Sequence, residues 1–165
     1  MAVRLCKIAL LACYTLLLGL IAFGNITDYG SNRPFVQHVL AMDTTFQSPG
    51  VMWRANADPT LQAIAYLGII ATETVAALVC SAGVIRLFRR RRASAETFDA
   101  AKSLAICGVT LSLVLWTGGF LAVGGEWFAM WQSGTWNGAS SAARFLLAGG
   151  VALLFLIQPD RELLA

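Results

Sequence analysis

The chain has 165 residues, of which 58% are hydrophobic and only 13% are charged. This composition is too apolar for an ordinary soluble domain of this size, so it predicts an integral membrane protein. The net charge of +3 is small, and nothing in the sequence indicates binding to nucleic acid.

Four apolar stretches follow one another along the chain, at about residues 5–24, 61–85, 103–125 and 142–157. A helix needs roughly 20 apolar residues to cross about 30 Å of hydrocarbon. The sequence therefore predicts an all-α fold: one integral membrane four-helix bundle with a structured outer cap. The first stretch lacks a convincing small-x-small cleavage site, so we expect it to remain as a helix.

Basic residues gather on one side of this predicted bundle. The inner set comprises Arg4, Lys7, Arg86, Arg89, Arg90, Arg91, Arg92, Lys102 and Arg161. The opposite side carries only Arg33 and Arg54, with Arg144 just inside the fourth stretch. The positive-inside rule then places both termini in the cytoplasm. We expect the arginines of the inner loop at 86–102 to contact anionic lipid, as juxtamembrane basic clusters do.

The first outer segment, residues 25–59, is too long for a simple turn and should carry structure of its own. Asn32 is predicted to cap a helix that has Pro34 in its first turn, where a missing N–H does no harm. The residues that follow divide into an apolar face and a polar face. This pattern is typical of an amphipathic helix that lies on the bilayer or covers the bundle.

His38 and Met42 lie four residues apart on that helix, a spacing that would let both reach one soft or borderline metal such as copper. A structural or surface role for the histidine is the alternative. We expect no resident metal or cofactor, because haem and zinc sites need several nitrogen or sulfur ligands and the chain has one histidine. Asp43 is expected to cap the helix or to form an ion pair with Arg33 or Arg54.

The second outer segment, residues 126–141, is rich in large aromatic side chains. Trp127 and Trp131 are predicted to share one helical face, which Trp53 of the first segment joins. An aromatic belt at the lipid headgroups is one interpretation, and a partner-docking surface is the other. The docking interpretation assigns to the outer cap His38, Met42, Asp43, Trp53, Arg54, Glu126, Trp127, Trp131, Gln132 and Trp136.

Several blocks in the outer segments resemble an uncharacterised bacterial family of predicted small integral membrane proteins, a domain of unknown function with four spans. They are NITDY at 25–29, HVLAMDTTF at 38–46, and GGEWFAMWQS at 124–133 with WNG at 136–138. The resemblance covers nearly the whole chain and implies a bacterial inner membrane. It brings no established activity or substrate. It also implies that the two outer segments carry the family's distinctive chemistry by packing on each other.

Glu73 is a lone carboxylate near the centre of the second apolar stretch. An ionisable group at this depth is costly unless a partner, water or a proton satisfies it, so it is the first place to look for function. Helical rise puts it about 18 Å below the outer start of the span. Tyr14, Thr15, Ser112 and Trp116 should lie at similar depth and complete an intramembrane polar site. A hydrogen-bonded structural glutamate, a proton or cation relay, and a contact to another subunit all remain open.

The expected function is a non-catalytic accessory subunit, or an assembly or stability factor, of a larger inner-membrane complex, such as a respiratory or transport complex. The alternative is a homo-oligomeric small transporter or channel with Glu73 as a proton or cation site. An enzyme has less support, because only His38, Asp43 and Glu126 offer acid-base groups and no nucleophile or phosphate motif accompanies them. The expected partners are the lipid bilayer and either a larger complex or further copies of the chain.

Overall fold

The computed structural model describes residues 1–162, and the described chain is a bundle of long helices without strands. Four of its helices are long and apolar enough to cross a membrane. The predicted all-α membrane bundle is therefore confirmed. The four are α1 (Ala2–Thr27), α3 (Pro59–Arg90), the run Ala95–Trp127 and α6 (Ala139–Ile157).

The third long helix changes geometry along its length. It passes from α4 (Ala95–Ala101) through α5 (Ser103–Val114) into a π-helix, η2 (Leu115–Trp127). The N–H of Phe128 still bonds five residues back, to the carbonyl of Val123 at 3.0 Å. A π-helix is usually a single turn and is frequent at functional sites. The 13 residues of η2 are longer than that, so this half of the helix is a candidate functional region.

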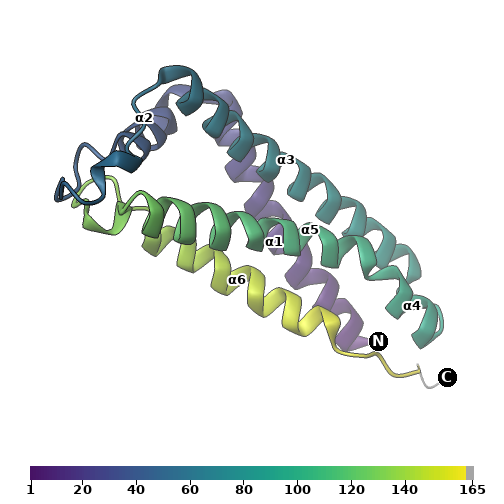
Figure 1. Cartoon of the computed structure of the whole chain (residues 1–165). Coiled ribbons are helices and arrows are strands. Elements are labelled where there is room, and N and C mark those ends of the chain that lie inside the picture. Colours follow the sequence, from purple (N-terminus) through teal and green to yellow (C-terminus); the bar gives the residue numbers. More distant parts are fainter. Residues whose placement is uncertain (163–165) are drawn as a thin grey trace.

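The N-terminus and the end of α6 lie at one end of the bundle, here called the terminal end, and α2 (Tyr29–Ala41) lies at the other, the loop end (Figure 1). At the terminal end, the predicted inner loop at 86–102 is largely helical. The α3 helix continues through Arg90, and α4 begins at Ala95 after its N-cap Ser94, whose hydroxyl accepts the Thr97 N–H. That cap restarts the helix after a turn of four residues, 91–94.

The core lies between α1, α3, α5 and α6, and small residues bring α3 and α5 close together. A Cβ added at Gly108 of α5 would lie 2.6 Å from the Cys80 sulfur of α3, and one added at Gly83 would lie 2.8 Å from the Ala105 backbone. Close backbone approach of this kind is how membrane helices gain packing energy. Leucines such as Leu78 and Leu147 point the other way and are 65% and 68% exposed, as expected of a lipid-facing surface.

The α2 helix follows α1 after one residue, Asp28, and this corrects the predicted helix start. Asn32 is not the N-cap, and Pro34 lies inside the helix instead of in its first turn. The Asn32 amide donates a 2.7 Å hydrogen bond to Asn25 of α1. Its side chain therefore links the two helices and does not cap one of them.

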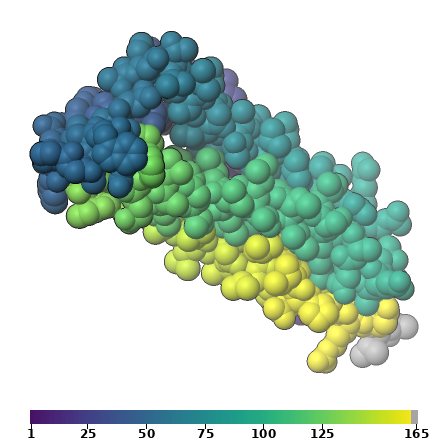
Figure 2. Space-filling view, in the orientation of Figure 1, coloured from purple at the N-terminus to yellow at the C-terminus, as the bar shows by residue number. Residues whose placement is uncertain are grey.

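The two connecting segments at the loop end pack on each other. The first contains the short helix η1 (Met52–Arg54) and the second contains η3 (Met130–Gln132). Met42 and Met130, one from each segment, are 0% and 1% exposed in a shared apolar cluster. The space-filling view shows the blue first segment lying directly against the green second one (Figure 2).

Candidate functional site

Glu73 is held by an amide at the last turn of α1. The carboxylate is 2% exposed, and its Oε2 accepts a 2.7 Å hydrogen bond from Asn25 Nδ2. Asn25 Oδ1 accepts a hydrogen bond from Asn32 of α2 at 2.7 Å and another from the Tyr66 hydroxyl of α3 at 3.4 Å. Asn25 of α1 thus links α2 and α3 beside the buried carboxylate.

The other residues assigned to the intramembrane polar site form separate contacts. Tyr14 and Ser112 meet through a buried 2.8 Å hydrogen bond between their hydroxyls. The Thr15 hydroxyl donates to the Leu11 carbonyl of its own helix at 2.7 Å. The Trp116 indole N–H is buried, and it has no hydrogen-bond partner among residues 1–162. Sequence reasoning missed Asn25, although a polar amide closing an apolar span was a usable signal.

A cleft of about 560 Å³ extends from Glu73 toward the loop end. Its walls come from α1, α2, α3, η2 and the beginning of α6, with Asn25, Asn32 and Tyr66 among the polar lining residues. Trp116 and Phe120 of η2 form an aromatic wall, with ring centroids 4.8 Å apart. The cleft therefore combines one carboxylate, neutral hydrogen-bonding groups and aromatic faces.

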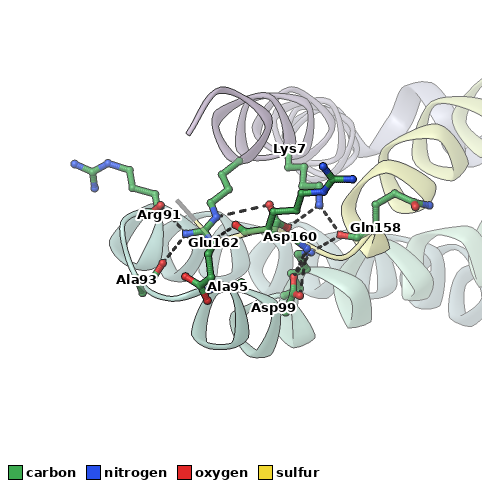
Figure 3. A network of polar contacts seen from close by, with 11 residues as sticks. Lys7, Arg91, Ala93, Ala95, Asp99, Gln158, Asp160 and Glu162 are labelled. Carbon is green, nitrogen blue, oxygen red and sulfur yellow. Dashed lines mark hydrogen bonds and ion pairs between the residues drawn. The ribbon is translucent and has the colours of Figure 1, made fainter. Parts of the chain in front are cut away.

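A second polar cluster, at the terminal end, was not predicted. It consists of Arg4, Lys7, Asp99, Lys102 and Asp160, here called the ion cluster (Figure 3). Asp160 Oδ2 lies 2.7 Å from the ammonium groups of both Lys7 and Lys102, and its Oδ1 lies 3.7 Å from Arg4 Nε. Lys102 also contacts Asp99 at 2.6 Å. Only the Asp99 and Lys102 pair, three residues apart, was visible as a sequence spacing.

The ion cluster has three cations for two carboxylates, and backbone carbonyls accept further hydrogen bonds from all three cations, although Arg4 Nε itself has no hydrogen-bond partner among residues 1–162. The Gln158 carbonyl accepts from Lys7 at 2.5 Å and from Lys102 at 2.7 Å. Arg4 donates to the carbonyls of residues 91, 93 and 161. Burial alone would raise the pKa of Asp160, but the hydrogen bonds from Lys102 and Lys7 outweigh it and lower that pKa below its ordinary value. The cluster thus ties α1 and α5 to the chain that follows α6.

The loop end carries two contacting groups of partly or largely exposed side chains, here together called the aromatic platform: Trp53, Arg54 and Trp127 form one, and Phe46 and Trp131 form the other. Trp53 and Trp127 pack edge to face at 5.5 Å, and Phe46 and Trp131 do so at 5.9 Å. The Arg54 guanidinium lies 5.4 Å and 5.0 Å from the ring centroids of Trp53 and Trp127. Each aromatic pair joins the first connecting segment to the second.

The prediction that Trp127 and Trp131 share a helical face is wrong. Trp127 ends η2 and Trp131 belongs to η3, because Ala129 between them adopts a left-handed conformation with φ of 52°. Gln132 nearby accepts a 3.0 Å hydrogen bond from the Phe46 N–H, whereas Glu126 is exposed.

His38 and Met42 do not converge as the copper hypothesis required. Met42 is fully buried in the apolar cluster, and the His38 ring stacks on Trp136 with centroids 4.6 Å apart. His38 Nδ1 lies 2.7 Å from Asp43, so this aspartate pairs with the histidine instead of Arg33 or Arg54. Within residues 1–162, no group of three or more metal-binding side chains occurs.

Four arginines of the basic run are exposed at the terminal end: Arg86, Arg89, Arg90 and Arg92. Arg91 is half-buried, and its guanidinium donates to the Phe88 carbonyl at 2.7 Å. The exposed four are therefore available to lipid headgroups.

A family model described as "Predicted small integral membrane protein (DUF2165)" matches residues 3–159. Searches of curated proteins and of solved structures give no significant match. The family match and the four apolar helices together establish an integral membrane protein.

Proposed function

Since the chain belongs to the family of predicted small integral membrane proteins, we propose that it is a non-catalytic accessory subunit, or an assembly or stability factor, of a larger complex in the bacterial inner membrane. The proposal rests on the large side chains that remain uncovered at the loop end of the bundle. It assigns the docking role to the loop end and leaves the transmembrane helices as the anchor.

The aromatic platform is the observation that carries this proposal. Phe46, Trp53, Trp127 and Trp131 remain 71%, 68%, 47% and 52% exposed, although each is packed against another ring. A preformed set of aromatic rings with an arginine between them has the composition of an interface hot spot. Because the rings are already ordered by their neighbours, a partner would bind them with little further loss of side-chain entropy.

The distribution of charge supports an orientation with both termini in the cytoplasm. Arg86, Arg89, Arg90 and Arg92 are exposed at the terminal end and match the positive-inside rule. The loop end, and with it the aromatic platform, would then face the periplasm. A docking partner is therefore expected to present its own periplasmic surface close to the membrane.

A matched pair of phenylalanines tests the proposal. The two side chains are similarly exposed, at 71% for Phe46 and 64% for Phe23, but Phe46 belongs to the platform and Phe23 lies on α1. Phe46→Ala and Trp53→Ala should strip a copurifying membrane partner from the tagged protein, whereas Phe23→Ala should retain it. Equal partner yield from all these variants, with the bundle intact by circular dichroism, would refute docking through the platform.

A second candidate function, a small homo-oligomeric transporter or channel, is favoured by one observation. Glu73 is a buried carboxylate that lines a cleft, as an ion or proton site within a membrane protein would. This candidate predicts that Glu73→Gln abolishes proton or cation flux in vesicles while the protein still folds. Unchanged flux in Glu73→Gln would refute the transporter or channel function.

A further inference from the structure

The cleft beside Glu73 adjoins a second cavity of about 210 Å³. Four residues line both spaces, and they are Phe35, Val36, Ile69 and Phe120. Beyond them the second cavity is walled by apolar side chains such as Val39, Leu40, Val123 and Met130. A polar chamber with a carboxylate thus adjoins an apolar chamber, and their dimensions suit a small organic ligand.

The polar chamber lacks a positive charge. Glu73 receives one hydrogen bond, from the neutral amide of Asn25, and it forms no ion pair with any cationic side chain in residues 1–162. The ion cluster at the other end of the molecule shows the contrast, because there the buried Asp160 carboxylate lies 2.7 Å from two lysines, Lys7 and Lys102. A carboxylate in an apolar setting is costly without a partner, so a cationic ligand would gain a strong electrostatic contact here.

The lining favours an organic cation over a metal ion. Trp116 and Phe120 contribute aromatic rings to the lining, and the π electrons of such rings attract ammonium groups. A divalent metal is usually held by several oxygen ligands that include more than one charged group, whereas the cleft offers a single carboxylate and otherwise only neutral amides, hydroxyls and a phenol. The adjoining cavity adds apolar surface that only a carbon-bearing ligand would use.

We propose that the cleft binds an organic ammonium compound, with its ammonium group paired to Glu73 and its apolar group in the cavity between α2, α3 and η2. This binding site is separate from the aromatic platform, because none of the platform residues lines either chamber. A failure of the partner-docking proposal would therefore leave the proposal of ligand binding unaffected.

A pair of probes with one difference tests the site on the full chain in a mild detergent. The probes are 2-phenylethylammonium and the neutral 2-phenylethanol, measured by titration calorimetry and by tryptophan fluorescence. The ammonium should bind saturably and at least about tenfold more tightly than the alcohol. Glu73→Gln should reduce its affinity to that of the alcohol, whereas the exposed Glu96→Gln should leave it unchanged. Equal affinity for the two probes, or unchanged ammonium affinity in Glu73→Gln, would overturn the proposal.

A glycine pair keeps the proposal testable if Glu73→Gln does not fold. Gly24 and Gly19 both lie on α1, and a Cβ added at either meets nothing within 4 Å, but only Gly24 lines the cleft. Gly24→Leu should narrow the cleft and weaken ammonium binding at least about tenfold, whereas Gly19→Leu should not. Equal ammonium affinity in the two variants would contradict binding at this site.

Discussion

The side-chain amide of Asn25 donates a 2.7 Å hydrogen bond to the carboxylate of Glu73, which joins the last turn of α1 to the interior of α3. A neutral amide is therefore the one hydrogen-bond donor to this buried acid among the described residues, and the oxygen of the same amide accepts the Asn32 and Tyr66 donors. This one side chain therefore links α2 to α1 and α3, beside the apolar contacts of Val36 with Tyr66 and Ile70.

Replacing Asn25 should destabilise the protein more than replacing the acid that it binds. Asn25→Leu leaves the buried Glu73 carboxylate and the buried Tyr66 hydroxyl without their partner, at a cost of about 1–3 kcal/mol for each group. Glu73→Gln keeps an oxygen that accepts the same hydrogen bond, so its cost should be smaller. Unfolding in detergent, followed by circular dichroism, measures both. Equal destabilisation by the two substitutions would show that Asn25 is not the organising residue.

The ion cluster should stabilise the terminal end through Asp160. Asp160→Asn leaves Lys7, Lys102 and Arg4 buried around a neutral group, and breaking a buried ion pair in this way costs roughly 3–5 kcal/mol. The exposed Glu96→Gln is the matched control and should change the free energy of unfolding by less than about 0.5 kcal/mol. A loss of similar size in both variants would contradict the assignment.

This stabilisation should also depend on pH in a defined direction. The folded-state pKa of Asp160 is lowered from the ordinary value of 3.8, so its contribution is complete above that value and is lost as the pH falls through the lowered pKa. The difference in unfolding free energy between the native chain and Asp160→Asn should therefore be constant from about pH 5 to 7 and should shrink below about pH 4. A difference that grows on acidification would have the wrong sign for this carboxylate.

Close packing of α3 on α5 predicts a strong effect from one added methyl group. A Cβ at Gly108 would meet the Cys80 sulfur at 2.6 Å and the Cys80 backbone nitrogen at 2.8 Å, and that backbone cannot move aside cheaply. Gly108→Ala should cost about 1–3 kcal/mol. Gly19→Ala on the open face of α1 should be neutral or stabilising by up to about 1 kcal/mol, because alanine is the better helix former. Thermal unfolding of the two variants decides between these outcomes.

The proposed orientation makes a prediction that reporter fusions check. A fluorescent protein fused after the last residue should mature in the cytoplasm, and alkaline phosphatase inserted between Ser48 and Gly50 should be active in the periplasm. Replacing the exposed Arg86, Arg89, Arg90 and Arg92 by glutamine should weaken this preference. Active phosphatase at the carboxyl terminus of the native chain would reverse the proposed topology.

The helices were predictable from the sequence, because apolar runs of spanning length leave few alternatives. The Glu73 partner was not, since it depends on how far two antiparallel helices slide past each other. The apolar run ended at Gly24, but α1 continues through Thr27 and brings Asn25 level with Glu73. Depth estimates from helical rise instead paired Glu73 with Tyr14 and Ser112, which bond to each other.

The ion cluster illustrates a second limit of sequence reasoning. Arg4, Lys7 and Lys102 were interpreted as topology signals, and charge counting alone supports that interpretation. Their burial depends on the segment after α6, which places Asp160 among them. Lys7 and its partners in that segment are about 150 positions apart in sequence. No local pattern encodes such a contact, whereas the Asp99 and Lys102 spacing was visible.

Mass spectrometry of the intact complex purified from its native membrane tests the proposed function most directly. The tagged protein should copurify with a larger membrane protein in fixed stoichiometry, and Trp53→Ala with Trp127→Ala should release that partner while the bundle remains folded. Recovery of the native chain only as a homo-oligomer, with no second protein in fixed ratio, would contradict the accessory-subunit proposal and favour transport through the Glu73 cleft.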